Sequence, residues 1–344
     1  RSGSVTGVQT CALPIYEHYG DNHYESEGHD SRLSSDQIRQ KAAQLNEQLG
    51  QVADGKEQRK VKRIEGKLQE AAQKMEQYEN QERVLAGRRS YSKTDQDAIF
   101  MRMKDGQFLP AYNVIQGTEN QFIINYTLAQ SSGESHLLKK HLQQLEQRLG
   151  KLPENIVGDA AYGSEENYAY LKDKSRAAYL KYTGYYHEQT RRHKQDRFHR
   201  DNLPYDPLTD SFTCPNGEKL IRRTSTKHLT PSGYERLANL YESRNCEGCS
   251  LADACKKKGQ ERRQLYINPT WDEFKKQART ILFSEKGIAL KKQRSIDVES
   301  SFGDIKHNQE YRRFRLRGLK KVTIEWGLIA ISHNLRKAAI RAAA

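Results

Sequence analysis

The sequence has few apolar residues for its length and no long run of them. Hydrophobic residues make up 35% of the 344 residues, and the mean hydropathy is −0.96. No apolar run approaches the roughly 20 residues that a membrane-spanning helix needs, and no stretch has the apolar core of a secretory signal. We therefore expect a modest core, much exposed helix and no membrane partner.

Acidic residues are also in the minority. The sequence holds 58 Lys and Arg against 44 Asp and Glu, which gives a formal net charge of +14 and a pI near 9.4. This balance favours an anionic polymer as partner, because each phosphate that is neutralised releases a counterion. A ribosome-associated or membrane-surface protein would carry the same charge, so the motifs must decide between these classes.

Cysteine is scarce as well, with five in the whole sequence. Cys11 stands apart near the start. The other four are a Cys-x-x-Cys pair with one outlying cysteine on each side: Cys214, Cys246, Cys249 and Cys255. Such a set can close a tetrahedral zinc site with Zn–S distances of about 2.3 Å, although it departs from the usual two Cys-x-x-Cys pairs. The alternative is four reduced thiols, since disulfides are rare in the cytosol. The turn Pro215-Asn216-Gly217 directly after Cys214 favours zinc.

The first sixteen residues match nothing downstream. Residues 4–15 resemble translated sequencing-adapter read-through, and the alternative is a native extended arm. We exclude residues 1–16 from the fold prediction. If the adapter interpretation holds, the natural protein begins further upstream and this chain lacks its true start. Residues 17–34 are polar and are expected to form a disordered lead-in.

Two narrow apolar stripes with helical spacing follow. The first includes Ile38, Ala42, Leu45, Leu49 and Val52, and the second runs from Val61 to Tyr78 beyond a break at residues 50–55. An antiparallel helical hairpin is the simplest structure for this pattern. Such an arm could face DNA or form a dimer, but we favour a spacer that packs on itself.

Asp159 ends a short apolar strand that begins at Asn155. Before it, residues 111–130 alternate like a β-hairpin and residues 134–149 have a helical pattern. After it, Ser164 with Glu165 and Glu166 marks the start of a helix, and residues 177–182 predict another strand. Open α/β sheets place their chemistry at the carboxyl ends of such strands.

Residues 298–306 have the pattern of one helix that follows a basic run. Glu299 and Lys306 are seven positions apart and would therefore lie on one face of that helix. An acid and a base on one face suit a site that holds a metal ion against a phosphate. The alternative is an exposed ion-pair helix, which the spacing alone favours.

Together, the Asp159 and Glu299 segments resemble the second and third acids of the DDE transposases of bacterial insertion sequences. The resemblance covers roughly residues 30 to 340. It extends to residues 91–98, 111–114, 313–318, 325–328 and 333–335.

The family has an α/β fold with an RNase H-like mixed sheet flanked by helices. Here the sheet would carry a long helical hairpin and a cysteine-containing insert. The implied organisation is an artefact at 1–16, a lead-in at 17–34, a hairpin at 35–87, the first part of the catalytic domain at 88–182, a basic Cys-containing insert at 183–285, and C-terminal helices with Glu299 at 286–344.

The resemblance also implies the chemistry. Asp159 and Glu299 would each be a ligand of one Mg²⁺ (or Mn²⁺) ion of a pair that activates the nucleophile and stabilises the leaving oxygen. Arg294 and Lys306 would contact phosphates. Further phosphate contacts are expected from a basic run that contains Arg312, Arg313, Arg315 and Arg317. In a related branch a Tyr, Arg, Glu and Lys signature surrounds the third acid; here Arg294 lies one residue further from the Glu and no Tyr is in place.

The expected partners are double-stranded DNA, as terminal repeats and target, and a second copy in a homodimer. The expected location is the bacterial cytoplasm, at the nucleoid when bound to DNA.

The first catalytic Asp of this family lies on the first strand, upstream of the helical hairpin. Residues 17–60 contain no such strand, so we expect it to be missing. Asp95 and Asp97 are the nearest acids, but Asp97 has the pattern of a helix N-cap and neither is assigned to catalysis. The predicted function is a transposase that cleaves and joins DNA. The alternatives are a catalytically incomplete DNA-binding remnant and a metal-dependent nuclease without strand transfer. This chain is expected to bind DNA without cutting it.

Overall fold

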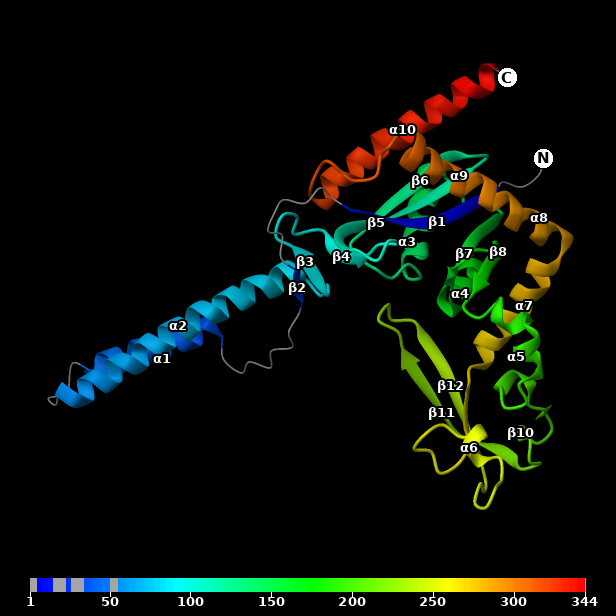
Figure 1. The fold of residues 1–344 in the computed structure, drawn as a ribbon, viewed down its shortest axis with the longest axis horizontal. Helices are drawn as coiled ribbons and strands as arrows, with labels where there is room; N and C mark the ends of the chain where they lie inside the picture. Colours follow the sequence, from blue (N-terminus) through cyan, green and yellow to red (C-terminus); the bar gives the residue numbers. More distant parts are fainter. Residues whose placement is uncertain (1–4, 15–22, 26–33, 50–54, 344) are drawn as a thin grey trace.

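A computed structural model describes residues 5–14, 23–25, 34–49 and 55–343 of the protein (Figure 1). Most of the predicted lead-in at 17–34, the predicted break at 50–54 and the outer residues of the 1–16 segment lie outside these ranges. In the part of the chain that is described, no helix is long and apolar enough to cross a bilayer.

The centre of the molecule is a six-stranded mixed sheet. Its strands are β1 (Val5–Pro14), β4 (Ile99–Arg102), β5 (Phe108–Glu119), β6 (Phe122–Ala129), β7 (Asn155–Gly163) and β8 (Ala177–Tyr182). β1 pairs antiparallel with β5 and parallel with β7, while β6 pairs with β5 and β8 with β7. Three antiparallel strands followed by two parallel ones, in the spatial order β6-β5-β1-β7-β8, confirm the predicted RNase H-like α/β fold.

β1 overturns one expectation from the sequence. Residues 5–14 were excluded from the fold, and the first strand was predicted to be missing, yet these residues form the strand between β5 and β7. Val8 and Leu13 are fully buried in the two cores on either side of the sheet. The strand is therefore present, with one apolar side chain in each core. It contains no Asp or Glu.

Helices cover both faces of the sheet. α3 (Leu137–Leu149) and α4 (Glu165–Asp173) pack with Val8 in one core. The C-terminal helical segments pack against the other face: α8 (Glu285–Arg294), η3 (Ser295–Glu299), α9 (Ser300–Gly303), η4 (Asp304–Asn308) and α10 (Leu319–Ala343). Ser164 caps α4 as predicted, since its hydroxyl accepts a hydrogen bond from the Asn167 amide. Trp326 of α10 is a fully buried core residue.

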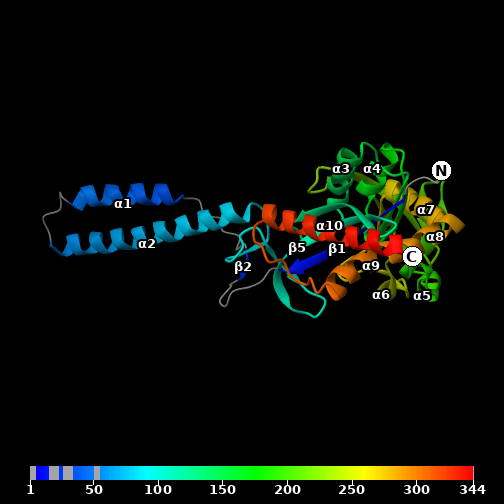
Figure 2. The same ribbon diagram turned by 90° about the horizontal axis from the view of Figure 1, so that it is seen from above.

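The two helices of the predicted hairpin project away from the sheet (Figures 1 and 2). α1 (Ser35–Leu49) and α2 (Gly55–Leu85) lie antiparallel, because Ser35 bonds to Glu79 and Arg39 pairs with Glu76. At the base of this arm, β2 (His23–Glu25) pairs with β3 (Ser90–Ser92).

The segment between β8 and α7 (Pro269–Phe283) forms a second, smaller unit. Its helical turns are η1 (His187–Gln189), α5 (Arg191–Gln195), η2 (Arg200–Asn202) and α6 (Ala252–Cys255). Its five-stranded antiparallel sheet has the order β13-β12-β11-β10-β9: β13 (Gln264–Ile267), β12 (Glu235–Ser243), β11 (Lys219–Leu229), β10 (Ser211–Thr213) and β9 (Tyr205–Asp206). The tip of the β11–β12 hairpin returns to α4, where Tyr234 and Arg236 contact the buried carboxylate of Glu165.

Candidate active site and metal centres

Asp159 and Glu299 lie over the same face of the sheet. Gly7 of β1 packs so closely beneath η3 that a Cβ atom there would lie 2.6 Å from Val298 Cγ2. Gly7 also pairs with Val157 of β7. Because side chains alternate along a strand, Asp159 points to the same face as Val157, which is the face that carries Glu299. The predicted approach of the two carboxylates to within a metal pair's span stays a prediction.

Each of the two carboxylates faces a cation. Asp159 Oδ1 lies 3.7 Å from Lys181 Nζ and accepts a hydrogen bond from the Ala160 amide at 2.8 Å. Glu299 Oε1 lies 3.3 Å from a terminal nitrogen of Arg294, whose side chain is almost fully buried. Both carboxylates remain about half exposed, so oxygen atoms are accessible to a hard cation such as Mg²⁺.

The sequence predicted one regular α-helix around Glu299, and this prediction is wrong. It ends the π-helical segment η3, which follows α8, and a second π-helical segment, η4, carries Lys306. Wider turns change the angle per residue, so a spacing of seven no longer fixes a shared face. Lys306 reaches β1 instead, where its Nζ atom donates to Cys11 Sγ.

Several buried polar atoms at this face lack a hydrogen-bond partner. They belong to β1, β5 and α8: Gln9 Oε1, Gln116 Oε1, Thr118 Oγ1, and Nε and one terminal nitrogen of Arg294. Gln9 of β1 pairs with Gln116 of β5. On the other side of β1, Val8 pairs with Gly158 of β7, and the next residues along these parallel strands are Gln9 and Asp159. Position 9 is thus the place on β1 that lies beside Asp159.

Asp95 and Asp97 have structural roles. The buried Asp95 accepts hydrogen bonds from the Tyr112 hydroxyl and the Gly318 amide, and Asp97 accepts one from the Leu319 amide at 2.8 Å. Asp97 was predicted to cap a helix that begins directly after it, but no helix begins there. Its carboxylate instead caps the start of α10, 222 positions further along the chain.

The predicted basic run forms the loop between η4 and α10. Arg312 and Arg315 are exposed, and Arg313 and Arg317 are half-buried. Among the described residues, none of the four forms a salt bridge. Glu325 of α10 fixes the loop by accepting hydrogen bonds from the amides of Arg315 and Leu316. The charges are therefore held on an ordered surface.

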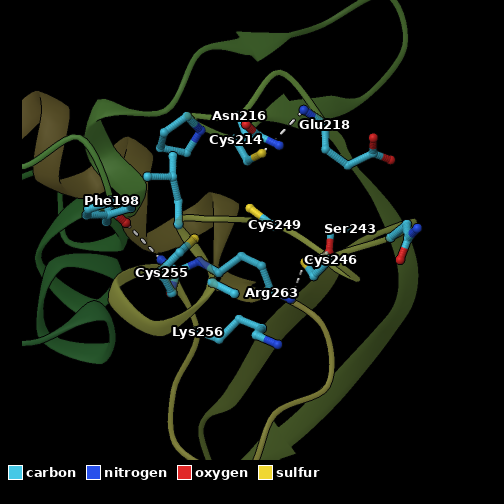
Figure 3. A pocket seen from close by; sticks show the side chains of 14 residues that line it. Phe198, Cys214, Asn216, Glu218, Ser243, Cys246, Cys249, Cys255, Lys256 and Arg263 are labelled. Carbon is cyan, nitrogen blue, oxygen red and sulfur yellow. Dashed lines mark hydrogen bonds between the residues drawn. The ribbon is translucent and has the colours of Figure 1, made fainter.

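The four cysteines of the insert line one cavity of about 20 Å³ (Figure 3). Cys214 Sγ accepts a hydrogen bond from the Glu218 amide, and Cys246 Sγ accepts one from the Arg263 amide. Burial raises the pKa of the Cys255 thiol; Arg263 opposes this and the other three cysteines add to it. The sulfurs are neighbours, although in the described ranges they form no set of three within 4.8 Å of one another. Amide donors around a small thiol-lined cavity suit a thiolate-bound ion.

Residues 213–339 match the family model of a transposase DDE domain. Over these residues the chain is similar to transposase DDE domains. No curated protein and no solved structure matches the chain. The matched residues include Glu299, the basic loop and all four cysteines of the insert. Asp159 lies before the matched residues.

Sequence reasoning missed Lys181 and Gln9 at this site. Lys181 could have been found, because it lies on the strand predicted beside Asp159 and alternation directs it to the same face. Gln9 could not, since only the pairing of β1 with β5 and β7 brings it there.

Proposed function

We propose that this protein is an insertion-sequence transposase that binds the ends of its element and cleaves and joins DNA with divalent metal ions. The observation that carries the proposal is the shared sheet face: Asp159 follows the strand beside β1, and Glu299 lies on the helical segment above it, in an RNase H-like sheet. The match to the transposase DDE domain and the basic loop support the same function.

Asp159 and Glu299 fit Mg²⁺ or Mn²⁺, because both offer accessible carboxylate oxygens. The bound ions would activate a water or 3′-hydroxyl and stabilise the leaving oxygen. Lys181 and Arg294 hold the two carboxylates at this face. Arg294 and the basic loop would position phosphates.

Among the described residues, the first strand supplies no third carboxylate to this site. β1 contains no acid, and Gln9 stands beside Asp159 among unpaired buried polar atoms, including two nitrogens of Arg294. A carboxylate at position 9 would supply a third metal ligand beside Asp159. We therefore propose that the chain as given binds DNA but does not cut it.

The test is cleavage of DNA that carries the element's ends, with Mg²⁺ or Mn²⁺. We expect the chain to bind without cutting, and Gln9→Asp to cleave in a metal-dependent way that Asp159→Asn or Glu299→Gln abolishes. Asp173→Asn, an exposed acid at the end of α4, is the matched control and should keep the gained cleavage.

Cleavage by the unaltered chain that Asp159→Asn abolishes would show that the acid set is already complete. A Gln9→Asp protein that binds DNA but still does not cut would reject position 9. Products that are cut but never joined to target DNA would favour a nuclease over a transposase.

We also propose that Cys214, Cys246, Cys249 and Cys255 hold one structural Zn²⁺ that closes the end of the insert. Elemental analysis should find this zinc in the purified protein and lose it in Cys249→Ser. Metal-free protein with a folded insert would instead favour four thiols.

A further inference from the structure

A second set of metal-ligand side chains lies in the insert, away from the cysteines. His193 Nε2 is 3.8 Å and His199 Nδ1 is 3.7 Å from the same carboxylate oxygen, Asp201 Oδ2. Within the described ranges, these residues are the one group of three His, Cys, Asp or Glu whose ligand atoms all lie within 4.8 Å of one another.

The backbone around this group is held by local hydrogen bonds. Thr190 caps α5 by accepting a bond from the His193 amide. His199 Nδ1 accepts one from the Asp201 amide at 3.3 Å, and an ion bound to this nitrogen would replace that bond. Asn202 donates from its side-chain amide to the carbonyls of His193 and Asp196. The side chains therefore converge on a framework that exists without an ion, which lowers the cost of binding one.

The group opens onto a cavity of about 260 Å³. The His187 ring also lines this cavity, with its centroid 5.1 Å from that of His193, so His187 or a water could supply a fourth ligand. The nearby cations already have partners. Lys275 lies 3.6 Å from Glu188 and 3.4 Å from Asp272, and Arg200 binds Asp272 and the other oxygen of Asp201. Lys275 also acts on Asp201 and, with Arg200, lowers the pKa of this carboxyl against the effect of burial.

A simple His–Asp ion pair explains this arrangement less well. Separations of 3.7 and 3.8 Å are too long for hydrogen bonds, and the His193 and His199 rings lie 4.2 Å apart, where two protonated rings would repel each other.

We propose that His193, His199 and Asp201 bind one divalent transition-metal ion of the zinc class. Two imidazole nitrogens and one carboxylate oxygen are ligands that zinc accepts, with one position left for His187 or water. The ion ties α5 to η2, and through the Arg200–Asp272 pair it anchors this part of the insert to α7. This site is independent of the cysteines and of the DNA-cleaving site.

The test measures zinc per chain after the full-length protein is stripped with a chelator, reloaded with Zn²⁺ and dialysed. We expect His199→Gln and Asp201→Asn each to bind one zinc fewer than the unaltered protein. His228→Gln, an exposed histidine on β11, is the matched control and should bind as much as the unaltered protein.

A Cys246→Ser/Cys249→Ser variant separates this site from the cysteine cavity. It should retain one zinc, and its X-ray absorption should report only nitrogen and oxygen ligands at about 2.0–2.2 Å. The proposal is overturned if His199→Gln and Asp201→Asn bind as much zinc as His228→Gln, or if the zinc that they lose is sulfur-bound.

Discussion

At the scale of single residues, acids with similar sequence surroundings have different roles. Asp159 is half exposed at the face of the sheet that carries Glu299, whereas Asp95 and Asp97 are committed to backbone amides of the loop before α10 and its first turn. An acid whose oxygens already accept protein hydrogen bonds has less capacity for a metal ion. The partners of each carboxylate therefore separate the candidate ligands from the structural residues.

We predict that Asp97→Ala lowers the free energy of unfolding by about 1 kcal/mol, the usual cost of losing a helix cap. Urea unfolding would measure it, with Asp173→Ala as the exposed control. In a Gln9→Asp background, Asp97→Ala should leave metal-dependent cleavage intact. Loss of cleavage in a protein that is still folded would make Asp97 a catalytic residue.

At the scale of elements, the helical segment above β1 is held from its other side by a buried pair. Asp304 of η4 lies 3.0 Å from His333 Nδ1 of α10, and His333 Nε2 lies 3.0 Å from the carbonyl oxygen of Gln121. The ring thus bridges the Asp304 carboxylate and a backbone carbonyl. This pair links η4, α10 and the β5–β6 turn, and so fixes the segment that bears Glu299.

The Asp304–His333 pair predicts a dependence of stability on pH. Burial alone would raise the pKa of Asp304, but hydrogen bonds from Asn308, His333 and Gln309 outweigh it and lower the pKa below its ordinary value. A lowered pKa in the folded state contributes stability above the unfolded value of about 4, and this contribution is lost as the pH falls through the folded pKa.

We therefore expect Asp304→Asn to cost about 2 kcal/mol at neutral pH, as for a hydrogen-bonded charged group, and progressively less below pH of about 4. Urea unfolding across this pH range would measure the difference from the unaltered protein. Asp173→Asn should follow the unaltered protein throughout. A cost for Asp304→Asn that does not change with pH would contradict the ionic role.

At the scale of the whole molecule, the protein has three parts that extend in different directions. The arm of α1 and α2 projects from one end of the sheet, and the insert lies below β7 and β8 in the view of Figure 1. The basic loop lies at the start of α10. Positive charge is present on the loop and also on the outer half of α2, at residues such as Arg59 and Lys60. Which of these surfaces meets DNA decides whether the arm is a spacer or a DNA contact.

The salt dependence of DNA binding distinguishes the two. Each phosphate contact contributes about 0.9 to the slope of log K against log salt concentration. Arg312→Glu/Arg315→Glu should therefore weaken binding and reduce that slope by about 2. Arg59→Glu/Lys60→Glu makes the same change in charge on the arm and should leave the slope unchanged if the arm is a spacer. A reduced slope for the arm variant, and none for the loop variant, would place the DNA on the arm.

The sequence by itself determined the features that depend on near neighbours. The Ser164 cap, the β5–β6 hairpin, the helical arm and the strand that ends at Asp159 are set by caps, turns and periodicities that act within a few residues. The order of these elements, together with the resemblance to DDE transposases, predicted the RNase H-like sheet.

Only the tertiary structure decided the rest. β1 was excluded because nothing in its own ten residues requires a strand at the centre of a sheet. Pairing with β5 and β7, whose partner residues lie 97 to 150 positions away, gives it that place. The same holds for Asp97, which caps a helix that begins 222 positions later in the sequence. The π-helical turns under Glu299 and the convergence of His193 with Asp201 also depend on how the chain packs. Contacts between distant residues carry no local pattern, because either partner alone is compatible with many neighbours.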